Sequence, residues 1–336
     1  MARTALFRLP LASDGRGMNA IDYDIRRLAQ RADSLAWAAA TRPGIRILDL
    51  PGSRVRVRVA GRGERTLVFA CDMPNVVESY DELIRLLGDQ YRIVCWEQPG
   101  FGFSYPKAGF GFGLEDYAAV MGAMLEALAF KSYVVVASCQ NVYQTLLVAD
   151  RWPQLVESVV LMQAVRWQEM RSFAAWAMKQ FAFAGAFVPV LGDRIIGTPW
   201  VGQWLWAAME RRIARRTHPH VIYRAQERKA RFEQIAQPLY AAHEHGACAC
   251  FASAFQHYYD YEAALPCVRQ PALVLWASAD RGHAQSDPKG LLEYAPHATW
   301  REIPETGHHL ELENPEAVST AIREFLRGEC VTIPEG

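Results

Sequence analysis

The sequence predicts an α/β protein with a doubly wound, mostly parallel sheet and a helical insertion. Apolar runs of strand length alternate with helical patterns from residue 45 to about residue 165. This alternation stops between about 168 and 262, and strands return at 272. Parallel strands joined by crossover helices produce such alternation, so one core with one interruption is the simplest organisation.

Residues 1–44 precede the alternation and are expected to form an N-terminal helical arm. Segment 21–42 has helical spacing, with Ile25 and Leu28 on one face, and Pro43-Gly44 ends it. We expect this helix to pack on the main domain. A dimer arm or a membrane-surface helix is the alternative.

The core begins with strands. Segments 45–50 and 54–60 alternate apolar and polar residues around Pro-Gly-Ser, which predicts a hairpin with one face toward water. The continuous apolar runs 66–71 and 91–97 are typical of strands buried on both faces. Further strands are predicted at 133–138, 156–164, 272–278 and 299–304, and helices at 80–89, 114–130, 142–152 and 315–328.

These elements divide the chain into a core of residues 45–167 and 263–336 and a helical lid of residues 168–262. The lid is rich in Trp, Phe, Ala and Arg. Its most apolar stretch, 173–191, contains Lys179, Gln180 and Pro189, so a buried or ligand-lining helix is favoured over a transmembrane segment.

Composition excludes several classes of function. Lys plus Arg and Asp plus Glu both number 36, which gives no basis for binding nucleic acid or an anionic membrane. The seven cysteines are irregularly spaced and the N-terminus lacks the apolar core of a secretory signal, so we expect a reducing, cytoplasmic protein. The His and Cys residues of 243–250 lack the paired spacing of a zinc site, and no metal or cofactor is expected.

One predicted strand ends at a cysteine that is a candidate nucleophile. Residues 133–141 read YVVVASCQN, a strand that runs into Ala-Ser-Cys with a helical pattern directly after it. Strand, sharp turn and helix form the setting of a nucleophile elbow, in which small neighbours let the central side chain project from the carboxyl end of the sheet. Cys139 occupies that central position.

Over about residues 45–165 and 265–328 the sequence resembles the α/β-hydrolase family. The elbow ASCQN, the segment WEQPGFGFS (96–104), the segment ADRWPQLVESVVLM (149–162), WASAD (276–280) and TGHHLELENPE (306–316) occur in the order of the family's motifs. The resemblance implies a catalytic triad of Cys139, Asp280 and His308. Polyhydroxyalkanoate synthases and dienelactone hydrolases are relatives that use a cysteine on this fold.

The chemistry of these residue types agrees with that assignment. A thiol must be deprotonated to attack, an imidazole can take its proton, and a carboxylate fixes the imidazole tautomer. Rival residues stay open: Ser138 for the nucleophile, Asp287 for the acid and His309 for the base. Strand alternation predicts that Ser138 points to the opposite side.

Departures from the family pattern concern the oxyanion hole, which the resemblance assigns to the backbone N–H groups of Gln140 and Met73. Asp72 replaces a glycine of the family's His-Gly, and it either lies beside the oxyanion or caps the helix at 79–89. Asn141 replaces the second small residue of the elbow, so the elbow is distorted or the amide points into the pocket. The side chains expected to contact substrate are Asp72, Asn141, Trp167, Trp176, Phe183 and His309.

The predicted function is covalent acyl catalysis that hydrolyses an ester, thioester or lactone with an apolar acyl or aromatic polyketide-like group. The first alternative is an acyltransferase or cyclase that acts on acyl chains bound to a carrier protein or coenzyme A. The basic segments 210–220 and 227–232 suggest a docking patch for such partners, or simply a solvated helix face. The second alternative is a ligand-binding protein without catalysis.

Overall fold

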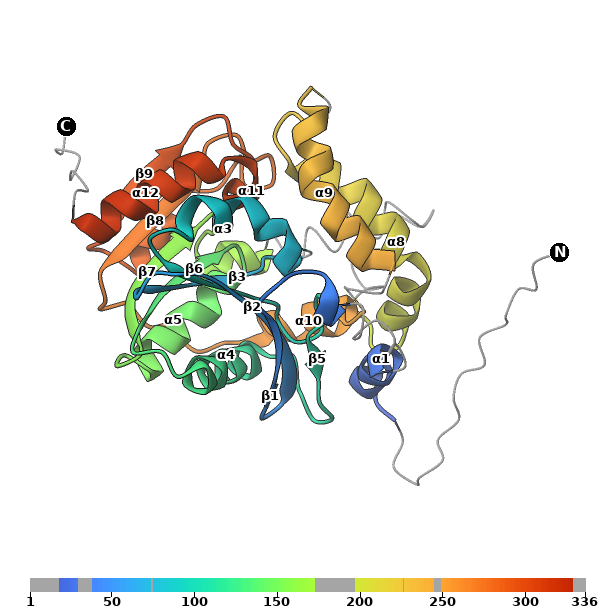
Figure 1. The fold of residues 1–336 in the computed structure, drawn as a ribbon. Coiled ribbons are helices and arrows are strands. Elements are labelled where there is room, and N and C mark those ends of the chain that lie inside the picture. Colours follow the sequence, from blue (N-terminus) through green and yellow to red (C-terminus); the bar gives the residue numbers. More distant parts are fainter. Residues whose placement is uncertain are drawn as a thin grey trace.

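The computed structural model describes residues 18–29, 38–73, 75–172, 197–225, 227–244 and 249–328. Within these ranges nine strands form one sheet in the order β1-β2-β4-β3-β6-β7-β8-β9, and β5 pairs with β2. Strands β4, β3, β6, β7, β8 and β9 are parallel to one another, whereas β2 is antiparallel to β1, β4 and β5. The predicted fold class is confirmed (Figure 1).

The strands lie close to the predicted segments. They are β1 Ile45–Leu50, β2 Ser53–Gly61, β3 Thr66–Ala70, β4 Arg92–Trp96, β5 Tyr105–Pro106, β6 Tyr133–Ser138, β7 Val156–Met162, β8 Ala272–Ala277 and β9 Thr299–Ile303. The predicted hairpin is confirmed as the antiparallel pair β1 and β2. The two-residue strand β5 is too short to leave a periodic signal in the sequence.

Helices flank the sheet. The helices of the described residues are α1 Ala20–Ala29, α3 Asp81–Leu87, α4 Leu114–Leu128, α5 Asn141–Arg151, α8 Val201–Val221, α9 Lys229–Glu244, α10 Phe251–His257, α11 Leu310–Glu313 and α12 Pro315–Arg327, with 3₁₀ turns η1 Val77–Tyr80, η2 Tyr258–Asp260 and η3 Gly290–Glu293. Helices α4 and α5 lie on one face, and α3, α11 and α12 lie on the other (Figure 1).

The central strands are apolar throughout because both of their faces are buried. In β3, Val68 joins the core cluster on the side of α4 and α5, whereas Leu67 and Phe69 join the cluster on the side of α3 and α12. Alternate side chains of a strand point to opposite faces, so a doubly covered strand needs apolar residues at every position.

The predicted wet face of the hairpin is wrong for β2. Arg56 is fully buried, and its guanidinium pairs with Glu78 and with Glu97 Oε1 at 2.7 Å. Its Nη2 also donates to the carbonyl of Ala38 at 2.8 Å. The end of the N-terminal arm, through Ala38 and Thr41, and the turn η1 contact Arg56 on this face. Charged residues with the spacing of an exposed strand therefore form a buried ion-pair network.

The connection from β8 to β9 has no long helix. The residues between Asp280 and His308 leave room for a crossover helix and a strand, but the described structure before β9 has the short 3₁₀ turn η3 in place of that helix. Pro288 and Pro296 lie on either side of η3, and a proline inside a helix removes one backbone hydrogen bond. The short connection still brings the ends of two adjacent parallel strands together.

Helices α8, α9 and α10 follow β7 and precede β8, where the insertion was predicted (Figure 1). Helix α1 packs near them, and its Asp24 accepts a hydrogen bond from Ser253 in α10 at 2.7 Å. None of the described helices combines the length and the apolar character needed to cross a bilayer. The apolar stretch 173–191 lies outside the described residues.

Candidate active site

Cys139 lies in the sharp turn between β6 and α5. Its φ of +53° is in the left-handed region, which is strained for a residue with a β-carbon. Its backbone N–H continues the sheet by donating to the carbonyl of Met162 at 3.0 Å. The turn therefore has the backbone shape of a nucleophile elbow, and Asn141 at the start of α5 has not distorted it.

Ser138 points away from this side of the sheet, as its alternation predicts. Its hydroxyl donates to Glu311 Oε1 at 3.4 Å, and the Tyr80 hydroxyl donates to the same oxygen at 3.1 Å. Ser138 is thus occupied in a buried polar contact behind the elbow.

His308 and Asp280 form a close pair at the ends of β9 and β8. His308 Nδ1 lies 2.7 Å from Asp280 Oδ2. Burial would raise the pKa of Asp280, but the charge and hydrogen bond of His308 outweigh it and hold this pKa below its usual range. The rival acid Asp287 lies elsewhere, where it pairs with Arg166 at 2.7 Å.

Gln163, which sequence reasoning missed, holds the acid in place. Its Nε2 donates to Asp280 Oδ2 at 2.7 Å, and its Oε1 accepts from the backbone N–H of Ala277 at 2.6 Å. The N–H of Gly282 donates to the other carboxylate oxygen at 2.7 Å. Gln163 follows β7 directly, so its position at the carboxyl edge of the sheet was the available signal.

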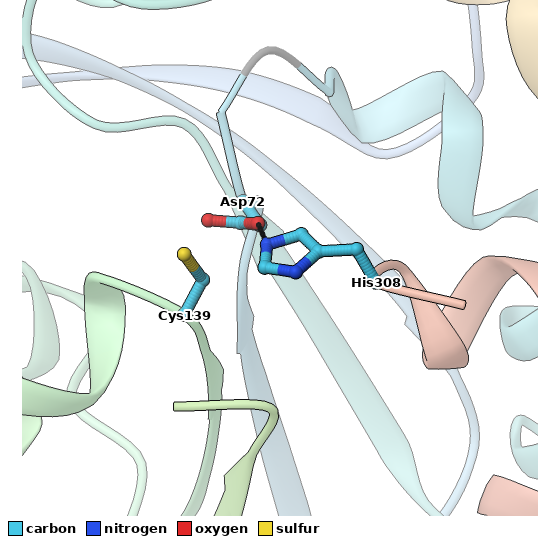
Figure 2. A group of neighbouring side chains, drawn as sticks. All are labelled: Asp72, Cys139 and His308. Carbon is cyan, nitrogen blue, oxygen red and sulfur yellow. Dashed lines mark ion pairs between the residues drawn. The ribbon is translucent and has the colours of Figure 1, made fainter. Parts of the chain in front are cut away.

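The thiol of Cys139 faces the other nitrogen of His308 (Figure 2). Burial, followed by the charge of Asp72, raises the pKa of this thiol, and hydrogen bonding to His308 opposes the rise. Burial would lower the pKa of His308, but the charges of Asp280 and Cys139 outweigh it and hold that pKa well above its ordinary value. Asp72 is therefore the neighbour that opposes thiolate formation.

Asp72 and Asn141, the two departures from the family pattern, contact each other. Asn141 Nδ2 donates to Asp72 Oδ1 at 3.4 Å, while Asn141 Oδ1 accepts from Gln98 and from Gln144. The amide of Asn141 is thus engaged within the protein. The expectation that Asp72 turns away to cap a helix is wrong, because its carboxyl lies 3.7 Å from His308 Nε2.

The two predicted oxyanion donors differ in their surroundings. The N–H of Gln140 lowers the pKa of the Cys139 thiol, which places it near the reacting atom. The N–H of Met73 lowers the pKa of the Asp72 carboxyl, so it lies near that group instead. The role of both as oxyanion donors stays a prediction.

Aromatic side chains line the elbow. Trp167 is buried, stacks on Tyr259 at a centroid distance of 5.8 Å and meets Tyr143 edge-on at 4.7 Å. The hydroxyl of Tyr258 donates to the carbonyl of Gln140, and that of Tyr259 to its Oε1 at 3.4 Å. Both tyrosines lie near the C-terminal end of the predicted insertion. Their proximity to the elbow was not predicted from the sequence.

The remaining predicted substrate contacts have separate outcomes. His309 is buried, with Nδ1 lying 3.6 Å from Asp72 Oδ2 and 3.3 Å from Asn75 Nδ2. It therefore adjoins Asp72 rather than Asp280. Trp176 and Phe183 lie outside the described residues.

Two groups of side chains among the described residues have donor atoms within 4.8 Å of one another, as a metal ion requires. The first is Asp72, Cys139 and His308, and the second is Asp280, His283 and His308. Burial, and then the charge of His308, lower the pKa of His283 to about 4, so this ring is neutral near pH 7.

The basic segments of the insertion make internal contacts wherever their side chains are described. Arg231 pairs with Glu82 and donates to the carbonyl of Leu312, and Arg228 lies 3.8 Å from Glu305. A docking role for these segments stays a prediction.

Comparisons with known proteins agree with this architecture. Residues 73–315 match the family model of the alpha/beta hydrolase fold. The chain belongs to the α/β-hydrolase family. This α/β hydrolase is 24% identical over 274 residues to the uncharacterized hydrolase YugF of Bacillus subtilis. The aligned region covers 79% of this chain and 91% of YugF.

Solved structures show the same fold. Epoxide hydrolase A from Mycobacterium thermoresistibile matches with a TM-score of 0.66 at 18% identity, over 85% of this chain and 99% of that protein. A thermophilic esterase from Thermogutta terrifontis matches with a TM-score of 0.59 at 21% identity, over 87% of this chain and 100% of that protein. At these identities the likeness concerns the fold alone.

Proposed function

We propose that the protein performs covalent acyl catalysis with Cys139 as nucleophile, His308 as base and Asp280 as the acid that orients the base. The substrate is an ester, thioester or lactone, and water releases the acyl group. The observation that carries the proposal is Cys139 in the left-handed conformation of the elbow, with its Sγ within 4.8 Å of His308, whose Nδ1 lies 2.7 Å from the buried Asp280 carboxylate. The names of YugF and of the Thermogutta esterase point to the same broad class of reaction.

The steps follow from this arrangement. His308 Nε2 takes the thiol proton while Sγ bonds to the carbonyl carbon, and the π electron pair moves to oxygen. Asp280 stabilises the imidazolium through Nδ1. When the oxyanion collapses, the bond to the leaving group breaks and His308 protonates that group. His308 then removes a proton from water, which attacks the thioester and frees Cys139.

The acyl group is proposed to be apolar. Trp167, Tyr143, Tyr258 and Tyr259 surround the elbow and present ring surface rather than charge. Apolar pockets with few polar groups are typical of small-molecule sites.

Transfer to an acceptor other than water is the second candidate. The observation that favours it is the aromatic surround of a half-buried cysteine, because a thioester shielded from water survives long enough to meet an amine, thiol or alcohol. The lifetime of the acyl-enzyme in water separates the two candidates.

The test is intact-mass spectrometry of the protein after exposure to p-nitrophenyl and thioester acyl donors of several chain lengths. An acyl adduct is expected on wild type, absent in Cys139→Ala and slower to form in His308→Ala. A short-lived adduct supports hydrolysis, and a long-lived adduct that clears on addition of an amine or thiol supports transfer. A folded wild-type protein that no donor acylates contradicts catalysis and favours the ligand-binding alternative.

A further inference from the structure

Asp72 lies where this site needs a hydrogen-bond donor. It lies in the loop after β3, its backbone N–H lies 3.4 Å from the Tyr80 hydroxyl, and its side chain is buried. Its carboxyl, His308 Nε2 and Cys139 Sγ have atoms within 4.8 Å of one another (Figure 2). An oxyanion that forms on a carbonyl attacked by Sγ would therefore form beside this carboxyl.

The two carboxyl oxygens have different surroundings. Oδ1 accepts a hydrogen bond from Asn141 Nδ2 at 3.4 Å. Oδ2 faces His308 Nε2 at 3.7 Å and His309 Nδ1 at 3.6 Å. His309 Nδ1 also lies 3.3 Å from Asn75 Nδ2. A proton on Oδ2 leaves the hydrogen bond from Asn141 to Oδ1 in place and faces the reacting atoms.

We infer that protonated Asp72 is an oxyanion donor of this enzyme, paired with the N–H of Gln140, and that acylation requires this carboxyl to be neutral. The inference rests on the proposed acyl catalysis at Cys139. It also accounts for the replacement in the oxyanion loop, because a neutral carboxylic acid donates a hydrogen bond where a carboxylate would repel the oxyanion.

The groups around Asp72 act on its charge in opposite directions. Burial raises the pKa of Asp72 to about 8, and the charges of Glu311 and Asp280 add to the rise. The charge of His308 and the N–H of Met73 oppose it. The titratable groups that face this carboxyl are His308, His309, Asp280, Cys139, Glu311, Tyr80 and Tyr259.

A neutral Asp72 helps the reaction twice. The charge of Asp72 raises the pKa of the Cys139 thiol, so its loss leaves His308 free to favour the thiolate. During attack the thiol proton goes to His308, the S–C bond forms, and the Oδ2–H of Asp72 donates to the oxyanion without leaving Asp72. On collapse the leaving group takes its proton from His308. Above pH 8 the donor is lost and a repelling charge replaces it.

The experiment compares wild type, Asp72→Asn and Asp72→Ala in pre-steady-state acylation of Cys139 by p-nitrophenyl butyrate between pH 6 and 9.5. Wild type is expected to slow as pH rises through about 8. Asp72→Asn keeps a neutral donor, so it is expected to lose that alkaline decline and to stay within about tenfold of wild type at pH 7. Asp72→Ala is expected to be about 10²- to 10³-fold slower at pH 7, as when an oxyanion donor is removed.

Infrared difference spectra provide a readout that needs no substrate. Wild type minus Asp72→Asn is expected to show the carbonyl stretch of a protonated carboxyl at pH 6 and its loss at pH 9.5. A carboxylate band at pH 6, an alkaline decline that persists in Asp72→Asn, or wild-type rates in Asp72→Ala would each overturn the inference while leaving acylation of Cys139 intact. A wild type whose Cys139 is never acylated overturns the proposed function and this inference together.

Discussion

Gln163 is predicted to position the triad acid, and Gln163→Met tests this. Methionine keeps the length of the side chain but removes two hydrogen bonds. One is donated by Gln163 Nε2 to Asp280 Oδ2 at 2.7 Å, and the other is donated by the Ala277 N–H to Gln163 Oε1 at 2.6 Å. A hydrogen bond to a charged group contributes about 1.5–3 kcal/mol, and a buried donor left without a partner costs about 1–3 kcal/mol. We therefore expect the free energy of unfolding to fall by about 2.5–6 kcal/mol.

The same change should slow catalysis. Asp280 keeps its bond from Gly282 at 2.7 Å, so part of its orientation survives. If the lost bond of about 1.5–3 kcal/mol is needed in full at the transition state, acylation slows by about 10- to 150-fold, since 1.36 kcal/mol corresponds to a factor of ten. The assays are guanidinium denaturation and the acylation rate of Cys139 under conditions in which the variant remains folded.

Gln90→Met on the exposed surface is the matched control, and it should change neither quantity. If the free energy of unfolding of Gln163→Met lay within about 0.5 kcal/mol of the wild-type value, the change would be no larger than that of an ordinary surface substitution. If it also acylated Cys139 at the wild-type rate, the positioning role of Gln163 would be refuted.

Further outcomes are expected for the buried ion-pair network and for the reactivity of Cys139. Arg56→Met should lower the free energy of unfolding by about 3–5 kcal/mol, measured by guanidinium denaturation, because it leaves buried carboxylates without their cation. Iodoacetamide should alkylate Cys139 more slowly than the exposed Cys267 at pH 7, and His308→Ala should slow this further, because His308 lowers the thiol pKa that burial and Asp72 raise.

Each of these has a control within the chain. Exposed Arg46→Met is the reference for Arg56, and equal stability losses would contradict the buried network. Cys267 should alkylate at one rate in wild type and in His308→Ala, so a change there would signal unfolding instead.

The strand and helix pattern was largely readable from the sequence because burial on both faces forces continuous apolar runs, as in β3. The triad candidates were readable for a related reason. Cys139 directly follows β6, and Asp280 and His308 lie in the loops after β8 and β9; the carboxyl ends of these strands lie at one edge of the parallel sheet. Local spacing thus indicated which residues would lie together.

The choice among rivals needed contacts over long sequence separations. Asp287 is as acidic as Asp280, but it pairs with Arg166, and only the packing of the β8–β9 loop shows this. Arg56 has the pattern of an exposed strand, yet elements distant in sequence bury it with Glu78 and Glu97. No periodicity in a single strand records what covers its second face.

The sequence by itself determined the parallel core, the elbow and the residue types that meet at the carboxyl edge of the sheet. These follow from local backbone preferences and from the alternation of side chains along each strand. Only the tertiary structure decided the charge environment of the site: Gln163 on Asp280, Asn141 on Asp72, and Asp72 against His308. The reason is physical, because desolvation and Coulomb interactions depend on distances between groups that the chain separates widely.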